Sequence, residues 1–512
     1  MIENLDEVRA RIDKIDDDIL SRFLERMKLS EQVAEYKAER NMPVEDTQRE
    51  YEIVEHVAEC SGEFSTYTTA LFRAMLELSK DYQEHWVKAY NEDEKRKVVQ
   101  MPGVYGLLGQ HLEHSYSEQI HKELGLRGRV AYDYRLLDVD PEELETFITR
   151  SDIAGLNVTM PYKTAILAFC QELSDEVLRI GAANTVVMKK GKLHAYNTDI
   201  AGFKYMVERA NINISGRKCI ILGNGGTSKA ARCALEDLGA REIVILSREG
   251  FNDYEALAIH FDAEIVVNAT PVGMYPDNLE KLVSLKSFPR CCAVIDVIYN
   301  PLRTALLLEA EELGIPYVGG LSMLVAQARE SYNLFFDRKM VNATVEDVTS
   351  MLYKQNENII LTGMPGCGKT TIAEAIGEAT EREVIDIDKV IELEQKKSVA
   401  EIINKYGEET FRNLEHAAIV ENCKESGKVI ALGGGAILDR NNYPALHQNG
   451  KIFFIRRDIS LLPTDDRPLS KSPETLMEMQ KIRLPLYQDA ADVEIENNGT
   501  IEDAVEKILK AL

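Results

Sequence analysis

The segment Gly363–Thr370, with the letters GMPGCGKT, constrains the fold of this chain more than any other feature. It follows the apolar run 359–361 and precedes a helical pattern, which is the strand–loop–helix context that the G-x-x-x-x-G-K-S/T pattern requires. Glycines there let successive backbone N–H groups point at phosphate oxygens. Lys369 would neutralise the β- and γ-phosphates, and the Thr370 hydroxyl would bind Mg²⁺. A chance glycine-rich turn is the alternative, but the context favours a phosphoryl-transfer module in the C-terminal third.

Composition limits the remaining possibilities. The 512 residues, 45% hydrophobic and 28% charged, are typical of a globular protein with about three domains. The net charge of −25 argues against binding to nucleic acids or anionic membranes. Neither an N-terminal signal nor a long apolar segment is present, so we expect a cytoplasmic protein. The eight cysteines show no C-x-x-C spacing, which favours free and mostly buried thiols.

Three segments of different character follow one another. Residues 1–90 are helical throughout, and the charged run 91–97 ends them. From 98 to 340, short apolar strands alternate with helices, which indicates an α/β fold. A connecting helix, with Thr344 and Asp347 as a capping box at its start, is expected before a second α/β block at 358–512.

The first segment has an apolar face at helical spacing, formed by Val8, Ile12, Ile15, Ile19, Phe23 and Val33. Arg26 and Lys37 lie within about 20° of each other on a helix, and cations on an apolar face are costly unless anions pair with them. A helix from about residue 5 to 40 would be roughly 54 Å long and could hardly bury its face alone. We therefore expect a second chain. A plain coiled-coil dimeriser, whose cations reach solvent, is the alternative.

Residues 1–90 resemble the all-helical chorismate mutase family at Arg9, Arg26, Lys37, Pro43–Asp46, Arg49, Glu50, Ser79 and Gln83. In that family an intertwined dimer binds the chorismate dianion and rearranges it to prephenate. The resemblance implies that Arg26 and the partner's Arg9 hold the two carboxylates. It implies that Lys37 and Gln83 donate hydrogen bonds to the ether oxygen. The hydroxyl and carboxylate ends would be lined by Asp46, Arg49, Glu50 and Ser79.

A dinucleotide-binding turn follows the apolar strand 218–222 in the middle segment. The next strand ends in Ser247 and Arg248, where NAD-binding proteins place an acidic residue. An arginine there favours the 2′-phosphate of NADP, although Glu249 beside it argues mildly the other way. The expected cofactor contacts are Gly223, Gly225, Gly226, Ser247 and Arg248.

Residues 102–340 resemble the shikimate dehydrogenase family through the motifs Ser115–Ser117, Asn157–Lys163, Gly181–Thr185, Asn197–Asp199, Asn268–Met274, Tyr299 and Gly320–Gln327. The resemblance implies NADPH-dependent reduction of 3-dehydroshikimate, with Lys163 and Asp199 as the catalytic pair and Lys163 handling the proton at the C3 oxygen. It implies a substrate lobe at about 98–200 plus C-terminal helices, and a Rossmann lobe at about 215–320. The substrate would contact Ser115, Ser117, Thr159, Asn184, Tyr299 and Gln327.

The middle segment departs from that family at two points. Glu118 stands where a proline is expected after the serine pair. Only 15 residues, 249–263, separate Arg248 from the strand 264–268, which is too short for the usual helix–strand–helix. One βα unit of the Rossmann lobe is therefore expected to be missing, on the adenosine side of the cofactor site. A quinate-type dehydrogenase is the alternative for this segment.

Residues 358–512 resemble shikimate kinase, because the phosphate loop is followed in order by Asp386–Asp388, Glu409–Glu415, Leu432–Gly435, Asp466–Leu469 and Arg483–Tyr487. The resemblance implies that shikimate is held by Asp388, Arg412, Gly434, Gly435 and Arg483. Asp388 would orient the attacking 3-hydroxyl, and Asp386 would support Mg²⁺ together with Thr370. A surface pair with Glu415 is the alternative for Arg412. ATP would contact Gly363, Gly366, Gly368, Lys369, Thr370 and the lid residue Arg467.

The sequence thus predicts a multidomain, trifunctional enzyme of aromatic amino acid biosynthesis. An all-α intertwined dimer would precede an α/β two-lobed dehydrogenase with a Rossmann domain and an α/β P-loop kinase. The expected cofactors are NADP(H), ATP and Mg²⁺, and the expected partners are chorismate, 3-dehydroshikimate, shikimate and a second copy of the chain. Because the dehydrogenase product is the kinase substrate, direct transfer is conceivable between those two domains. The alternative for residues 1–90 is a dimerisation or ligand-sensing module without turnover.

Overall fold

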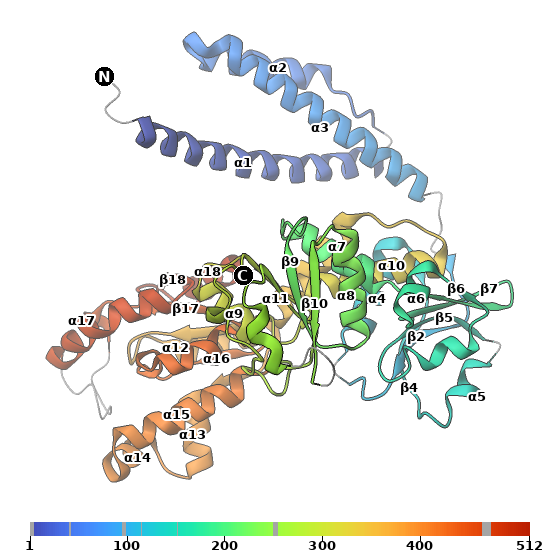
Figure 1. The fold of residues 1–512 in the computed structure, drawn as a ribbon. Coiled ribbons are helices and arrows are strands. Elements are labelled where there is room, and N and C mark those ends of the chain that lie inside the picture. Colours follow the sequence, from blue (N-terminus) through green and yellow to red (C-terminus); the bar gives the residue numbers. More distant parts are fainter. Residues whose placement is uncertain are drawn as a thin grey trace. The chain divides into compact units, whose positions relative to one another are not determined.

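The computed structural model describes residues 5–39, 42–94, 99–113, 115–150, 152–248, 254–462 and 473–512. The chain divides into two compact units (Figure 1). Met1–Met101 with Arg129–Ala131 form the first, and Pro102–Gly128 with Tyr132–Leu512 form the second.

The first unit is built of three helices, α1 (Leu5–Glu39), α2 (Thr47–Cys60) and α3 (Ser65–Glu94). Both α1 and α2 pack against α3. Ile12, Ile15 and Ile19 on the apolar face of α1 remain 50%, 55% and 51% exposed. A single chain therefore leaves this face in water. The unit also contains β1 (Val99–Gln100), which pairs in parallel with β3 (Val130–Ala131).

The substrate lobe contains a six-stranded sheet in the order β4-β2-β5-β7-β8-β6. The strands β4, β2 and β5 run parallel, and β7 runs antiparallel to its neighbours β5 and β8. The strands are β2 (Val104–Gly109), β4 (Tyr134–Asp138), β5 (Ile153–Val158), β6 (Glu172–Leu173), β7 (Thr185–Lys189) and β8 (Lys192–Tyr196). The helices are α4 (Ser117–Gly128), α5 (Leu144–Ile148) and α6 (Asp175–Ile180).

The Rossmann lobe is a parallel five-stranded sheet in the order β10-β9-β11-β12-β13. Its strands are β9 (Lys218–Leu222), β10 (Glu242–Leu246), β11 (Ile265–Asn268), β12 (Ala293–Asp296) and β13 (Tyr317–Val318). Helices α8 (Gly226–Asp237) and α9 (Ala305–Glu312) belong to it, and α7 (Asp199–Arg209) packs against α8. Helix α10 (Leu321–Phe336) packs against α7 and against α4, β5 and β7 of the substrate lobe. The described residues between β10 and β11 contain only the 3₁₀ turn Tyr254–His260, and β10 lies at the sheet edge. This matches the shortened βα unit predicted from the 15-residue spacing.

The connecting helix α11 (Asn342–Asn356) is present, but its predicted capping box is wrong. The helix begins at Asn342 after Val341, without a side-chain cap. Arg329 Nη1 donates to Asn342 Oδ1 at 2.8 Å, and Asp347 accepts from Arg127 Nη1 at 3.0 Å. These contacts with α10 and α4 fix the start of α11 two residues earlier than Thr344, so Asp347 serves as an ion-pair partner.

The C-terminal domain is a parallel sheet in the order β15-β16-β14-β17-β18. The strands are β14 (Asn358–Thr362), β15 (Val384–Asp386), β16 (Val429–Ala431), β17 (Gly450–Arg456) and β18 (Val493–Glu496). The helices are α12 (Lys369–Thr380), α13 (Ile387–Gln395), α14 (Val399–Tyr406), α15 (Glu408–Cys423), α16 (Tyr443–His447), α17 (Pro473–Ala490) and α18 (Ile501–Ala511).

Polar contacts join the Rossmann lobe to the C-terminal domain within the second unit. The Leu302 N–H donates to Asn449 Oδ1 at 2.9 Å, and Arg303 Nη2 donates to the Gly450 carbonyl at 3.0 Å. Tyr116 of the substrate lobe donates to Asn356 Oδ1 at the end of α11 at 2.8 Å. We call this contact region the seam.

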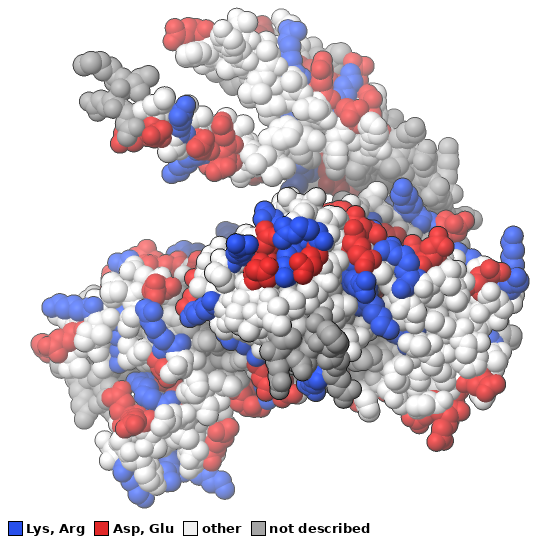
Figure 2. Space-filling view, in the orientation of Figure 1, with Lys and Arg blue, Asp and Glu red and all other residues white. Residues whose placement is uncertain are grey.

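Lys and Arg are interleaved with Asp and Glu on the face of the second unit drawn in Figure 2. Among the described helices, none combines the length and apolar character needed to cross a membrane. All eight cysteines are free, and four of them are buried.

Candidate active sites

One cavity of about 220 Å³ between the substrate lobe and the Rossmann lobe brings together the predicted dehydrogenase residues. They reach it from strand ends and helix starts, where parallel sheets place ligand groups. The cavity is lined by all eight of them: Ser115, Ser117, Thr159, Lys163, Asn184, Asp199, Tyr299 and Gln327.

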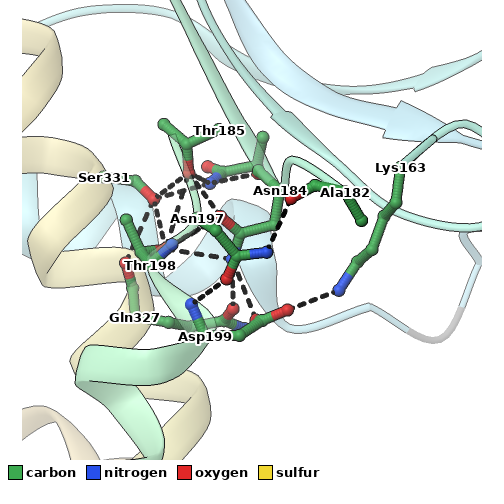
Figure 3. A network of polar contacts seen from close by, with 10 residues as sticks. Lys163, Ala182, Asn184, Thr185, Asn197, Thr198, Asp199, Gln327 and Ser331 are labelled. Carbon is green, nitrogen blue, oxygen red and sulfur yellow. Dashed lines mark hydrogen bonds and ion pairs between the residues drawn. The ribbon is translucent and has the colours of Figure 1, made fainter. Parts of the chain in front are cut away.

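Lys163 and Asp199 form an ion pair at the centre of this cavity (Figure 3). Lys163 Nζ lies 2.7 Å from Asp199 Oδ2, and the two side chains are 19% and 4% exposed. Asp199 opens α7, and its N–H donates to Asn197 Oδ1 at 3.1 Å. A buried carboxylate at a helix N-terminus is favoured by the helix dipole. The lysine is the more accessible partner and is the group placed to meet a ligand.

Asn184 holds this carboxylate in place through a buried network (Figure 3). Its Nδ2 donates to Asp199 Oδ1 at 2.8 Å and to Gln327 Oε1 at 3.0 Å. Its Oδ1 accepts from the Thr198 N–H at 2.8 Å. Because the Gln327 carbonyl is engaged, its amide nitrogen is the group left to contact a ligand. Satisfied networks of this kind fix side-chain positions.

The sequence reasoning assigned no role to two polar residues that also line the cavity, Asn157 and His121. Asn157 Nδ2 donates to Ser331 Oγ at 2.7 Å, and its Oδ1 accepts from Tyr134 at 2.8 Å. His121 stacks on the Tyr134 ring at 3.9 Å, and burial lowers its pKa to about 3, so the ring is neutral. His121 follows Ser117 by four residues, a spacing that places both on one helix face and could have identified it.

The glycine turn between β9 and α8 adjoins the same cavity. Gly223 has φ +102°, and a Cβ there would lie 3.0 Å from the Ala269 carbonyl. Ser228 Oγ donates to the Gly223 carbonyl at 2.6 Å, which accounts for serine at the third glycine position. Gly226 approaches Lys163, since a Cβ would be 3.6 Å from its Cδ, and open space surrounds Gly225. This cradle fits a dinucleotide pyrophosphate at the α8 N-terminus.

The end of β10 carries the other two predicted cofactor residues. Ser247 is half-buried, whereas Arg248 is exposed. A guanidinium at this strand end fits a 2′-phosphate. Glu249, which argues mildly against a 2′-phosphate at this strand end, lies outside the described residues.

A larger cavity of about 650 Å³ lies over the carboxyl ends of β14, β15 and β16. It is lined by ten of the predicted kinase residues: Gly366, Gly368, Lys369, Thr370, Asp386, Asp388, Arg412, Gly434, Gly435 and Arg483. Gly363 begins the loop with φ +148° but is not among the lining residues. Arg467 lies outside the described residues.

The phosphate loop is shaped to receive a polyphosphate. Gly366 and Gly368 have φ +83° and +100°, a region that favours glycine. Lys369 Nζ donates to the Gly363 and Met364 carbonyls at 2.9 and 3.1 Å, so the buried ammonium lies inside the loop. Thr370 Oγ1 donates to Asp386 Oδ2 at 2.7 Å. This hydroxyl and carboxylate are the hard oxygen ligands that fit Mg²⁺.

The other half of this cavity carries paired and unpaired charges. Arg412 Nη1 lies 2.6 Å from Glu415 Oε2, but Glu415 is only 1% exposed, so this pair is buried and the alternative of a surface pair for Arg412 is not supported. Glu415 Oε1 and Asp388 Oδ1 are buried without a hydrogen-bond partner among the described residues. Burial, and then the nearby Asp386, raises the pKa of Asp388. Unpaired carboxylate oxygens facing a cavity are suited to accept hydrogen bonds from a ligand's hydroxyl groups.

Two backbone features complete the ligand half of the cavity. Arg483 Nη1 donates to the Gly434 carbonyl at 2.8 Å. A Cβ at Gly435 would lie 2.2 Å from Arg412 Nη2, so only glycine leaves room for this guanidinium. The sequence reasoning quoted Glu415 within its motif but assigned it no ligand role, and its burial could not be read from the spacing.

In the helical unit, one group of predicted residues gathers between α1 and α3. Arg26 Nη1 donates to Ser79 Oγ and, at 3.3 Å, to the Met75 carbonyl; burial lowers the pKa of this guanidinium. Gln83 Oε1 is buried without a partner among the described residues. Lys37 Nζ donates to the Val44 carbonyl at 2.7 Å.

The remaining predicted residues of this unit stay outside that group. Arg9 is exposed and pairs with Asp6 at 3.6 Å, while Arg49 pairs with Glu52 at 3.3 Å. Asp46 caps α2 by accepting from the Arg49 N–H at 3.1 Å, and Glu50 lies half-buried in the first turn of α2.

Comparison with known proteins connects each part of the chain to a family. Residues 8–84 match the model of chorismate mutase type II, 107–186 that of the shikimate dehydrogenase substrate binding domain, and 365–512 that of shikimate kinase. A shikimate dehydrogenase (NADP(+)) of Caldicellulosiruptor bescii is 36% identical over 275 residues, covering 49% of this chain and 95% of the relative. The enzyme of the same description from Methanopyrus kandleri is 38% identical, covering 45% and 89%.

A solved structure with a related domain combination was also found. It is a chorismate mutase/shikimate 5-dehydrogenase fusion protein from Clostridium acetobutylicum, 31% identical, with a TM-score of 0.47, covering 50% of this chain and 98% of that one. The family models and curated relatives do not favour a non-catalytic N-terminal module or a quinate-type dehydrogenase. The chain therefore belongs to the shikimate dehydrogenase family, and it is a multifunctional enzyme of aromatic amino acid biosynthesis that joins this dehydrogenase to a chorismate mutase domain and a shikimate kinase domain.

Proposed function

We propose that the three reactions are catalysed at three separate sites, in domains at about 1–90, 98–340 and 358–512. The dehydrogenase assignment rests on the 2.7 Å contact between Lys163 and Asp199 in the inter-lobe cavity. The turn Gly223–Gly226, Ser247 and Arg248 would hold NADPH, which would supply the hydride. Lys163 Nζ transfers a proton to the C3 oxygen of 3-dehydroshikimate, and Asp199 orients the ammonium. The substrate's carboxylate and hydroxyls contact Ser115, Ser117, Thr159, Asn184, Tyr299 and Gln327.

Replacing the catalytic lysine tests this assignment. Lys163→Ala should lower kcat for shikimate oxidation by about 10²–10⁴-fold, the usual contribution of a positioned acid–base group. The rate of NADPH formation measures the effect. Lys192→Ala is a matched control, since Lys192 is 57% exposed and pairs with Glu172 at 3.0 Å. Kinase activity of the same preparations should stay unchanged. Near-normal dehydrogenase activity of Lys163→Ala would contradict the assignment.

The arginine at the end of β10 carries the proposed preference for NADP. Arg248→Ala should raise KM for NADP by about tenfold, because a charge-assisted contact to the 2′-phosphate is lost, and should leave KM for NAD nearly unchanged. Arg241→Ala is the matched control, since Arg241 precedes the same strand at its other end and pairs with Glu264 at 3.3 Å. Equal losses with both nucleotides would disprove the 2′-phosphate role.

For the kinase, the supporting observation is the buried Asp388 Oδ1, which has no hydrogen-bond partner in the part of the chain that the structure describes. We propose that Asp388 accepts the proton of the attacking 3-hydroxyl of shikimate, while Arg412, Gly434, Gly435 and Arg483 hold the substrate. The loop Gly363–Thr370 would hold ATP, and Thr370 and Asp386 would hold Mg²⁺, which would supply positive charge beside the phosphates. Lys369 is aimed at the β- and γ-phosphates. Arg467 is proposed as a further ATP contact.

The pH profile of the kinase should report Asp388. Its carboxylate must be ionised to accept a proton, and burial raises its pKa, so kcat/KM should fall with acidification at a higher pH than for an ordinary aspartate, about 3.9. Glu392 also raises this pKa, so Glu392→Gln should move the acid limb to lower pH. Glu374→Gln, which removes an exposed carboxylate that pairs with Lys389, is the control. An acid limb that does not respond to Glu392→Gln would rule out Asp388 as the titrating group.

For the mutase, we propose a homodimer formed through residues 1–90. Arg9 and Arg26 are 17 residues apart on α1, which separates them by about 25 Å along the helix axis, too far to hold one small dianion. A second chain can supply Arg9 to the site containing Arg26, and it can also cover the exposed isoleucines of α1. Lys37 and Gln83 then donate to the ether oxygen, and Ser79, Asp46, Arg49 and Glu50 line the ends of the substrate.

Mixing two inactive variants tests the shared site. Arg9→Ala and Arg26→Ala should each be nearly inactive alone. Co-folded, they should recover about a quarter of the normal rate of chorismate consumption, because half of the dimers are mixed and each carries one intact site. Arg22→Ala, which removes an arginine 82% exposed on the same helix, should remain active. No recovery from verified mixed dimers would show that both arginines act within one chain.

A further inference from the structure

A third cavity, of about 580 Å³, lies in the seam, apart from the three sites described above. It is lined by Ser322 at the start of α10, by Thr349 and Lys354 of α11, by Arg303, and by Lys451 at the start of β17. Its volume is in the range of small-molecule sites. We call it the seam cavity. Both the dehydrogenase and the kinase domain contribute residues to its lining.

The lining of the seam cavity carries an excess of cationic groups. Lys354 and Lys451 form no ion pair with any described residue, although Lys451 Nζ donates to the Ala511 carbonyl at 2.6 Å. Arg303 pairs with Glu311 at 3.3 Å, and Arg209 with Glu346 at 2.8 Å. Glu357 is the one carboxylate side chain among the described lining residues, and burial raises its pKa. Lys354 and Lys451 thus have no ion-pair partner among the described residues, and burial biases the lining carboxyl of Glu357 toward its neutral form.

Three buried polar atoms in this lining have no hydrogen-bond partner among the described residues. They are Arg303 Nε, Ser322 Oγ and Thr349 Oγ1. Ser322 and Thr349 are only 3% and 6% exposed. A buried group left unpaired costs free energy, so such groups usually have a ligand or water as partner. All three can donate a hydrogen bond, and a ligand that complements them must present acceptors.

The N-terminus of α10 adds to this donor set. The 16-residue helix starts after Gly320 without a side-chain cap, and its positive dipole end lies where Gly319, Leu321 and Ser322 line the seam cavity. The other side of the same turn, at Gly320 and Met323, lines the substrate cavity of the dehydrogenase. One helix start therefore separates the two cavities.

We propose that the seam cavity binds a small oxyanion, a phosphoryl or carboxylate group, with Lys354, Lys451, Arg303 and the hydroxyls of Ser322 and Thr349 as its contacts. Such a group presents several acceptor oxygens and a negative charge, and these match the unpaired donors and the two lysines that form no ion pair with a described residue. The ligand touches the dehydrogenase, the connecting helix and the kinase at once, so the site is a property of the fused chain.

Binding is tested on the full chain saturated with NADP⁺ and ADP, so that the cofactor phosphate positions are occupied. Inorganic phosphate and malonate serve as separate probes in isothermal titration calorimetry, and the tighter one identifies the group preferred. Lys354→Gln and Lys451→Gln should each weaken binding about tenfold, because each removes a charge-assisted contact. Lys510→Gln is the matched control, since Lys510 is 74% exposed and pairs with Glu506 at 2.5 Å. Binding to this control should stay within about twofold of the parent.

Ser322→Ala supplies an independent test. It removes an unpaired buried hydroxyl, so the variant should remain folded with an unchanged or higher midpoint of thermal inactivation, yet it should bind the probe several-fold more weakly. Absence of binding of both probes up to about 10 mM, where a complex would be very weak, would overturn the proposal. Binding that is unchanged in Lys451→Gln and Ser322→Ala would overturn it equally.

Discussion

Parallel strands end at the same edge of a sheet, and the second unit of this chain depends on that constraint. In the Rossmann lobe, the parallel pairing of β9 and β11 places the glycine turn beside Asn268. In the kinase, the pairing of β14 with β16 places the phosphate loop opposite Gly433–Gly435. Residues far apart in sequence are brought to one cavity because each follows a strand of the same sheet. The strand ends bring the catalytic groups near one another, and side-chain contacts such as that of Asn184 with Asp199 then fix their positions.

The same constraint explains which residues could be predicted from the sequence. A strand end or a glycine turn lies beside each of four proposed catalytic residues, Lys163, Asp199, Asp388 and Lys369. The local sequence pattern therefore predicts both the strand or turn beside each residue and the edge of the sheet at which the residue lies. The buried partner of Arg412 could not be predicted in this way. Glu415 is three residues further along α15, and spacing alone cannot tell a buried ion pair from one on the surface.

The start of a helix is harder to predict from the sequence, because it can depend on contacts with residues elsewhere in the chain. The start of α11 is fixed by contacts with Arg329 and Arg127, which lie outside this helix. A capping pattern within the helix itself cannot reveal such contacts. The residues of the proposed mutase site are harder still to place from the sequence. Arg26, Ser79 and Gln83 gather within one chain, but the position of Arg9 along α1 acquires a meaning only when a second chain is considered. Hydrophobic periodicity identifies the apolar face of such a helix, but it does not identify the segment that packs against that face.

The shortened Rossmann lobe leaves β10 as an edge strand, and an edge strand can pair with a strand of another molecule. Without the missing βα unit, β10 has β9 as its only paired neighbour among the described strands, so one row of its backbone amides and carbonyls is available for strand addition. The strand is short, and it enters through the exposed charged residues Arg241 and Glu242. Charges at the entrance of a short edge strand oppose the docking of a second edge, because their desolvation would accompany pairing. The loss of a structural unit is thus offset by residues that discourage aggregation at the edge it uncovers.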